Sequence, residues 1–328
     1  MWRLSIGLAI SLLTPGGASA QKLELRGQVE QQPAPATVIL YGSTFPFNAR
    51  TLSDGKGRFR FKDLDPGAYT VSVFVPGRGE VRQTVEVSRS LADAEGRVGV
   101  TIAFIPSPDS LEASATVSIG ELTIPPKAQR EYRRAQQRLS ERDEPGAIRH
   151  LEQAVKIAPG FVAAWNNLGT IAYQTRRYAD AEKYFRTALE HEPGAYSPVV
   201  NLGGTLLSLG RYAEALKYND YALQQRPRDA LANSQMGLTH YFLGNEELAI
   251  RYLTEAKRLD PAHFSHPQIT LARIHAGRGD LPRAIAELED FLNRHPDAPN
   301  AGPLRTWMEQ LRQAPGANRP LEVKPRKR

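Results

Sequence analysis

The sequence predicts two folded units in series, an antiparallel β-sandwich followed by a solenoid of paired α-helices. Three observations lead to this fold class. Hydrophobic residues alternate with a period of two up to Pro106, they take helical spacing from Lys127 onward, and the helical part repeats itself about every 34 residues. The chain has 328 residues, 41% of them hydrophobic and 23% charged, which is enough for two such units.

The first twenty residues have the pattern of a cleaved export signal. Arg3 precedes the apolar stretch Leu4–Leu13, and Ala18-Ser19-Ala20 forms a small-x-small cleavage site. About ten apolar residues are fewer than the roughly 20 that a membrane-spanning helix needs. We therefore expect removal of residues 1–20 and a secreted or periplasmic mature protein. A buried N-terminal helix or a retained anchor is the alternative.

The chain contains no cysteine. Disulfides, thiolate nucleophiles, cysteine zinc sites, iron–sulfur clusters and a lipoprotein anchor are therefore excluded. The folded units must take their stability from buried apolar surface.

The net charge of +7 is concentrated at the ends of the chain. The leader carries +1 and the tail, residues 315–328, carries +4, which leaves +2 for the rest. A nucleic-acid-binding protein usually spreads basic charge over a structured face, so no nucleic-acid partner is expected. The tail is predicted to be disordered, and contact with an anionic membrane surface is expected there alone.

The first unit, residues 21–106, has the pattern of short, half-buried strands. Turn signals such as Asp65-Pro66-Gly67 and Pro76-Gly77 separate the apolar alternations. The alternating segments are Leu23–Leu25, Val38–Leu40, Phe59–Phe61, Tyr69–Val73, Val81–Val87 and Val98–Ile102. About seven strands at this spacing predict a small antiparallel β-sandwich.

A compound motif lies in the middle of this unit. Asp54-x-x-Gly57-x-Phe59-x-Phe61 is followed by Pro66-Gly67-x-Tyr69. On these residues the unit resembles the carboxypeptidase regulatory-like (transthyretin-like) domain. The resemblance implies a structural or adhesive module without peptidase activity, because zinc in that family belongs to a separate domain with a His-x-x-Glu pair. None of the seven histidines here has an acidic residue three positions on.

Residues 107–126 are predicted to form a linker. Prolines bracket the strand-like pieces Thr116–Ile119 and Leu122–Ile124, which leaves room for one extra strand on either unit.

An internal repeat determines the fold of the second unit, residues 127–298. Two series of small residues and one of large apolar residues recur at steps of 34, 34, 34 and 35 residues. They are Ala135, Gly169, Gly203, Gly237 and Ala272; Ala147, Ala181, Ala215, Ala249 and Ala284; and Leu151, Phe185, Leu253 and Leu288, with Asn219 as a polar exception. Small residues let two helix backbones approach closely, so each unit is expected to be a pair of crossing helices.

The second of these units carries the fullest motif: Trp165, Leu168, Gly169, Tyr173, Tyr178, Ala181, Phe185, Ala188 and Pro193. It resembles the tetratricopeptide repeat (TPR), with Tyr173 one position later than is usual. We therefore expect an all-α TPR solenoid of five repeats, at 128–161, 162–195, 196–229, 230–263 and 265–298. A capping helix over residues 299–314 is expected to present Leu304, Trp307 and Met308 on one face.

The resemblance implies a concave groove lined by the first helix of each repeat. The lining residues expected to bind a partner are Asn166, Asn167, Thr170, Tyr173, Val200, Asn201, Ser208, Ser234, Gln235 and Tyr241. Asn167, Asn201 and Gln235 recur at steps of 34 residues, and such amides both donate to and accept from the backbone of an extended peptide. The alternative is that they are common repeat residues that merely face solvent.

No catalytic, metal or cofactor site is predicted. His263, His266 and His275 lie near one another in sequence but lack a further ligand at suitable spacing. No Gly-x-Ser-x-Gly elbow, phosphate loop or dinucleotide motif is present.

The leading hypothesis is an exported, non-enzymatic scaffold that binds a peptide or helix of a protein partner in the TPR groove, in cell-envelope assembly or secretion. The alternative is an adhesive or glycan-binding β-domain with the repeats as a spacer.

Overall fold

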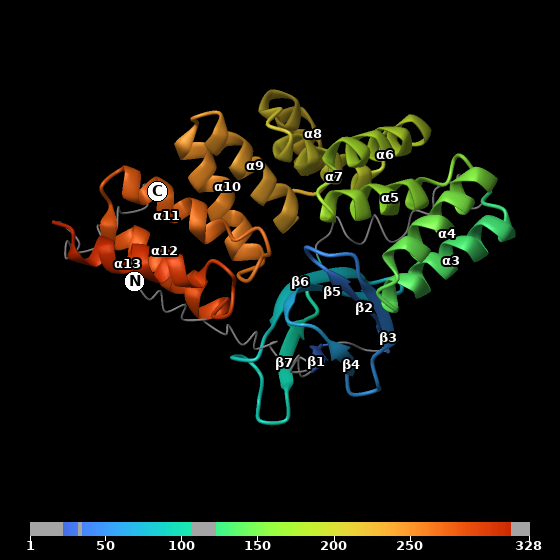
Figure 1. Ribbon diagram of the computed structural model, residues 1–328, viewed down its shortest axis with the longest axis horizontal. Helices are drawn as coiled ribbons and strands as arrows, with labels where there is room; N and C mark the ends of the chain where they lie inside the picture. The colour runs from blue at the N-terminus through green and yellow to red at the C-terminus, as the bar shows by residue number, and fades with distance from the viewer. Residues whose placement is uncertain (1–21, 32–34, 107–122, 316–328) are drawn as a thin grey trace, which may run out of the picture.

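The computed structural model describes residues 22–31, 35–106 and 123–315. Seven strands form a sandwich, and the helices between residues 126 and 313 form an arc around it (Figure 1). No helix within the described ranges is long and apolar enough to cross a membrane. The predicted leader, residues 107–122 of the predicted linker and residues 316–328 of the tail lie outside the described residues.

The sandwich consists of two sheets, as predicted. One has the order β4 (Arg58–Leu64), β1 (Leu23–Glu30), β7 (Arg97–Ala103), and the other has the order β3 (Asn48–Leu52), β2 (Thr37–Gly42), β5 (Gly67–Val75), β6 (Gly79–Val87). Their facing sides bury one apolar core that includes Leu25, Leu40, Tyr69 and Ile102. Strand β3 was not among the predicted segments, because this edge strand has no fully buried side chain and so no clear alternation.

One strand pair departs from the predicted antiparallel arrangement. β1 pairs with β4 in antiparallel orientation but with β7 in parallel, from Glu24 opposite Arg97 to Glu30 opposite Ala103. The chain leaves β6 in the other sheet and crosses over before β7, so the last strand enters in the direction of the first. A hairpin would force antiparallel pairing, whereas a crossover between sheets does not.

Within residues 123–315, the helices form five antiparallel pairs and one final helix. The pairs are α3 (Pro126–Ser140) with α4 (Glu144–Ile157), α5 (Val162–Gln174) with α6 (Tyr178–His191), α7 (Tyr196–Ser208) with α8 (Tyr212–Gln225), α9 (Ala230–Phe242) with α10 (Glu246–Leu259), and α11 (Pro267–Gly277) with α12 (Leu281–Arg294). The final helix, α13 (Ala301–Gln313), packs Leu304 and Met308 into the apolar cluster of α12.

Local chemistry sets the helix ends. The Asp143 and Asp229 side chains accept hydrogen bonds from N–H groups in the first turns of α4 and α9. Gly210 and Gly244 follow the first helices of their units at φ of 74° and 77°, a conformation that glycine adopts without strain.

The small residues predicted at the helix crossings lie there. A Cβ atom on Gly169 would lie 2.5 Å from the Phe185 ring, and one on Gly237 would lie 2.6 Å from Leu253. The polar exception, Asn219, is fully buried against Gly203 and donates through Nδ2 to Thr239 Oγ1 at 2.9 Å. At the second, third and fourth crossings, therefore, a glycine leaves room for one large side chain of the partner helix.

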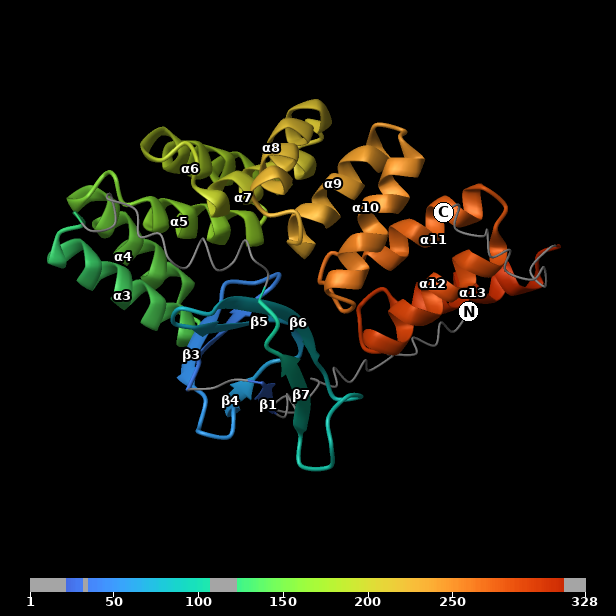
Figure 2. The same ribbon diagram turned by 180° about the vertical axis from the view of Figure 1, so that it is seen from behind.

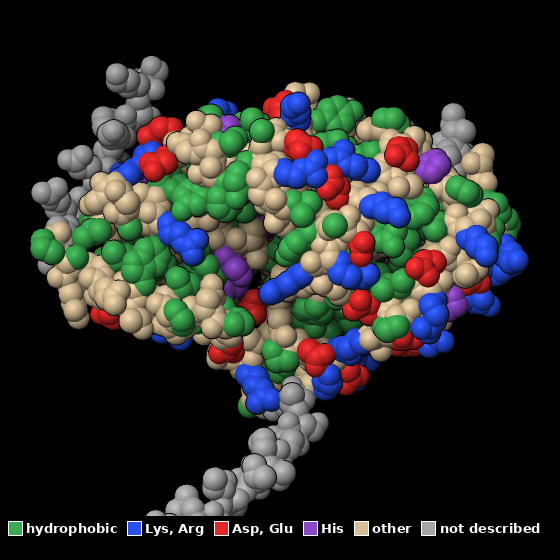
Figure 3. Space-filling view, turned by 45° about the horizontal axis from the view of Figure 1, so that its top comes forward, with side chains coloured by type: hydrophobic (Ala, Val, Ile, Leu, Met, Phe, Trp, Pro, Cys, Tyr) green, Lys and Arg blue, Asp and Glu red, His purple; other side chains and the backbone are tan. Residues whose placement is uncertain are grey.

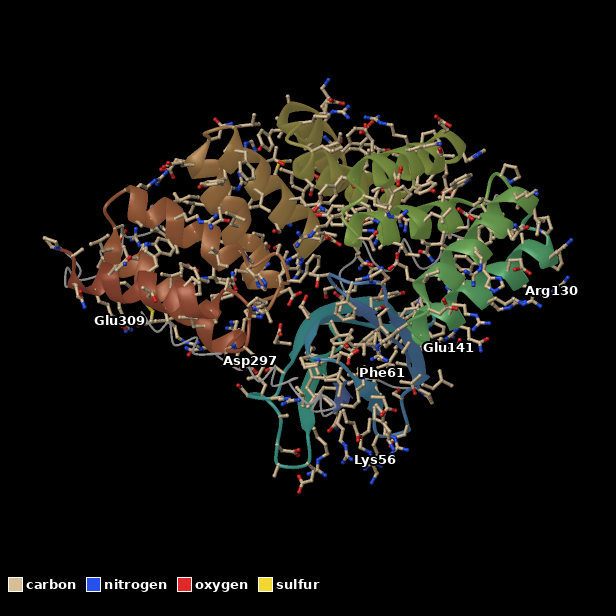
Figure 4. All side chains as sticks on the ribbon, in the orientation of Figure 1. Lys56, Phe61, Arg130, Glu141, Asp297 and Glu309 are labelled. Atoms are coloured by element: carbon tan, nitrogen blue, oxygen red, sulfur yellow. The ribbon has the colours of Figure 1, made fainter. Side chains whose placement is uncertain are left out.

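The sandwich lies inside the curve of the array (Figures 1 and 2). At the first end of the array, Arg142 donates to Asp63 O at 2.7 Å and pairs with Asp65 at 2.9 Å. At the other end, Ser90 N donates to Asp297 Oδ2 at 3.0 Å. Figure 4 labels Asp297 on the side of the array nearest the sandwich and Lys56 at the opposite tip of the sandwich. The array therefore curves over one side of the sandwich and contacts it at both ends, rather than holding it at a distance.

Candidate functional site

A cavity of about 520 Å³ lies between the four-stranded sheet and the concave side of the array. Figure 3 shows that one face of the molecule is hollowed near its centre, with Lys or Arg and His side chains at the rim. Side chains of the sheet form the floor: Tyr41, Thr70, Glu80, Arg82 and Thr84. Helices α3, α5 and α7 and the turns that follow α8 and α10 form the opposite wall.

The period of the strands explains why polar residues form this floor. In β6, Val85 and Val87 face the sandwich core, so Glu80, Arg82 and Thr84 face the opposite side of the sheet. In an isolated sandwich this face would be exposed to solvent. Here it faces the array, so its polar side chains become part of a shared site.

Five of the ten predicted binding residues line the cavity. They are Asn166, Asn167, Thr170, Val200 and Asn201, all on α5 and α7.

The amides of this group already make hydrogen bonds within the array. Asn167 Nδ2 donates to the Tyr132 hydroxyl at 3.1 Å, and Asn201 Nδ2 donates to Asn166 Oδ1 at 3.0 Å. These bonds fix the orientation of the amides. Each amide can make more than one hydrogen bond, so these residues can still bind a partner.

The other five predicted residues lie elsewhere. The Ser208 hydroxyl donates to the Tyr173 hydroxyl at 3.2 Å, and this pair lies beyond the cavity. Ser234 is fully buried and bonds to Ser265 Oγ at 2.6 Å, and Tyr241 packs beside the cluster of α10 and α11.

Gln235 departs from the expected amide ladder. Its side chain packs where a Cβ atom of Gly204 would be, and only 8% of the residue is exposed. The two consecutive glycines of α7, at positions 203 and 204, leave this space, so the longer Gln side chain turns into the array. The ladder therefore has two members on the cavity, Asn167 and Asn201.

A charged cluster that the sequence analysis missed lies at one end of the cavity. Glu80 accepts from Arg82 Nε at 2.8 Å and from Ser72 Oγ at 2.5 Å. Burial alone would raise the pKa of Glu80, but the charge of Arg82 brings it below its usual value. The Arg226 guanidinium lies 3.9 Å from the centre of the Tyr196 ring, and burial raises the pKa of Tyr196. The sequence did contain a signal for this cluster, because charged residues occupy the positions of β6 that face away from the core.

Asp260, at the end of α10, joins this wall to the sheet. Its Oδ2 accepts from Thr84 N at 3.0 Å and from Thr84 Oγ1 at 2.6 Å, and the residue is 5% exposed. Burial raises the pKa of Asp260, although the hydrogen bonds from Thr84 oppose that shift. A second contact joins the array to β6: His295 Nδ1 lies 3.2 Å from Glu86 Oε2.

The histidines do not form a metal centre. His263 lines the cavity and bonds through Nδ1 to Ser265 Oγ at 2.7 Å, and burial lowers the pKa of His263 to about 3. Within the ranges that the structure describes, no three His, Cys, Asp or Glu side chains are grouped to hold a metal ion.

Comparison with known proteins identifies the helical part. The family model of the tetratricopeptide repeat matches residues 132–198, 167–230 and 200–264. The helical part of this chain is a tetratricopeptide repeat array. The TPR resemblance predicted from the repeat motif is therefore confirmed, whereas the carboxypeptidase regulatory-like resemblance of the sandwich stays a prediction.

Several solved structures are similar to part of this chain. A thermophilic TPR protein of Thermus thermophilus has 21% sequence identity and a TM-score of 0.45, with 56% of this chain and 98% of that chain covered. MamA of Desulfovibrio magneticus has 19% identity and a TM-score of 0.47, with coverage of 54% and 99%. PilW, a type IV pilus biogenesis factor, has 21% identity and a TM-score of 0.48, with coverage of 59% and 97%. No curated protein matches the chain in sequence.

Proposed function

We propose that this protein is an exported, non-enzymatic scaffold that binds an extended segment of a partner protein in the cavity between sheet and array. The observation that carries the proposal is that Asn166, Asn167, Thr170, Val200 and Asn201 line one cavity together with the outer face of the sheet. The TPR fold itself indicates a protein-interaction scaffold. Export is proposed from the pattern of the first twenty residues, and cell-envelope assembly or secretion is the role that fits it.

The chemistry of the walls suits a polypeptide. Amides and hydroxyls on both walls can donate to and accept from a peptide backbone. Tyr41, Tyr132 and Phe264 add rigid aromatic surface of the kind that dominates binding energy at interfaces. A volume of about 520 Å³ is within the range of sites that enclose small ligands, so it fits a few residues rather than a folded domain.

The alternative function, with the β-domain as binding module and the repeats as a spacer, has less support. A spacer would separate the sandwich from the rest of the chain. The array instead contacts the sandwich through Arg142 at its first end and Asp297 at its last.

A photo-crosslinking amino acid at Ser197 tests the proposal. Ser197 is exposed and lines the cavity, and Tyr221, 43% exposed and outside the cavity lining, is the matched control position. In intact cells we expect one crosslinked protein from position 197, outside the cytosol, and none from position 221. Adding Thr170→Trp, which places a large side chain in the cavity from a half-buried wall position, should abolish that crosslink.

Two results would contradict the proposal. Equal crosslinking from both positions, or crosslinking that persists in the filled variant, would place the contact outside the cavity. Recovery of the uncleaved chain from the cytosol alone would contradict export.

A further inference from the structure

The first half of β6 is an open sheet edge beside the cavity. β6 is the last strand of its sheet and pairs with β5 along its length. Thr84 N–H donates to Asp260, so it points away from β5. In an antiparallel pair the N–H and C=O of one residue point to the same side, and the side alternates along the strand. The backbone groups of Glu80 and Arg82 therefore also point away from β5.

The array covers one half of this edge and leaves the other half open. From Thr84 onward, Asp260, His295 and Asp297 contact Thr84, Glu86 and Ser90. Among the described residues, none makes a hydrogen bond to the outward N–H or C=O of Glu80 or Arg82. Proteins usually cover or block such edges, because an unpaired edge is a template for another strand. Here the open half borders the candidate site.

We propose that the partner segment binds by β-strand addition to Glu80–Arg82, as a fifth strand beside β6. This inference rests on the proposed function and names the conformation of the segment. The open edge starts after the Pro76–Arg78 turn and ends where Asp260 occupies Thr84 N–H. It therefore accommodates four or five residues, because a strand rises about 3.3 Å per residue.

Charge indicates what the segment carries. Arg226 and Arg228 both line the cavity, and neither lies within 4.0 Å of a carboxylate in the described part of the chain, although the charge of Arg226 helps to lower the pKa of Glu80. An arginine binds a carboxylate through two parallel N–H groups. The bound strand therefore carries a carboxylate, either an acidic side chain or its own C-terminus, next to the residues that pair with β6.

The test separates the backbone of Arg82 from its side chain. Arg82→Pro removes the outward N–H but no bond to β5, because proline is tolerated on the open side of an edge strand. Arg82→Ala removes the side chain and keeps the N–H, so it is the matched control. The probes are two pools of randomised, fluorescein-labelled hexapeptides, one with free and one with amidated C-termini.

We expect the wild-type chain to select acidic hexapeptides, or free C-termini if the chain end is bound. Affinity for the selected peptide should be at least about tenfold lower in Arg82→Pro than in Arg82→Ala, because both variants lack the guanidinium and only Arg82→Pro lacks the outward N–H. N-methylation along the selected peptide should weaken binding at alternate positions, since every second N–H pairs with the edge. The N-methyl scan uses the wild-type protein, so it tests strand addition even if Arg82→Pro does not fold.

Each contrary result has a distinct meaning. A selected peptide that binds Arg82→Pro as well as Arg82→Ala, or an N-methyl scan without alternation, overturns strand addition while the cavity remains a peptide site. Selection of peptides without carboxylates overturns the assigned role of Arg226 and Arg228. Failure of both pools to yield any binder contradicts the proposed function together with this inference.

Discussion

Replacement of Asp260 by alanine is expected to loosen the attachment of the sheet to the array. The carboxylate accepts two hydrogen bonds from Thr84, at 3.0 and 2.6 Å, and both residues are buried. Alanine leaves the Thr84 N–H and hydroxyl without this acceptor. Hydrogen bonds to charged groups contribute about 1.5–3 kcal/mol each, but burial of the charge offsets part of that sum. We therefore expect a loss of about 2–4 kcal/mol.

The asparagine variant tests the source of this energy. An amide oxygen can accept the same two bonds without a buried charge, and burial already raises the pKa of Asp260. Asp260→Asn is therefore expected to lose no more than about 1 kcal/mol. Glu255→Ala is the control on the same helix, because its pair with Arg258 lies at the surface and contributes little.

Amide hydrogen exchange of Thr84 measures the effect directly. A loss of 2–4 kcal/mol corresponds to exchange that is about 30- to 900-fold faster in Asp260→Ala, since 1.36 kcal/mol is tenfold. The Thr84 amide in Asp260→Asn and Glu255→Ala should exchange within about fivefold of wild type. Unchanged protection in Asp260→Ala, or equal losses in the alanine and asparagine variants, would refute the reasoning.

Two further predictions concern stability. Burial lowers the pKa of His263 to about 3 and of His266 to about 4, against about 6.5 in an unfolded chain. Between these values the unfolded state binds more protons than the folded state, so the free energy of unfolding, measured in urea, should decrease as the pH falls from 6.5 to 4. The raised pKa of Asp260 opposes part of this decrease. A free energy of unfolding that does not change over this pH range would contradict the prediction. At the second crossing, Gly169→Ala should destabilise the chain by about 1–3 kcal/mol, because its Cβ would lie 2.5 Å from the ring of Phe185. Phe185→Leu in the same chain should recover part of that loss in thermal unfolding, and strictly additive losses would show that the two residues do not share the space.

The helical array and most of the sandwich could be predicted because each depends on a local period. Gly169 and Phe185 recur in register with their counterparts, and one repeat shows which face of each helix is buried. Five groove residues follow from the same register. Strand β3 could not be predicted, because an edge strand without buried side chains has no alternation. The inward turn of Gln235 depends on the glycines of the neighbouring helix, which its own repeat does not show.

The sequence by itself determined the two folded units, the number of repeats and the concave face of the array, because periodic burial is encoded within each segment. Only the tertiary structure decided that the sheet lies inside the array and shares its groove. That arrangement depends on contacts such as Thr84 with Asp260, which lie 176 residues apart in the chain. Neither residue recurs in a pattern, and each has an ordinary local role, one in an edge strand and one at a helix end. Their pairing forms only when both units are folded, so it leaves no periodic signal in the sequence.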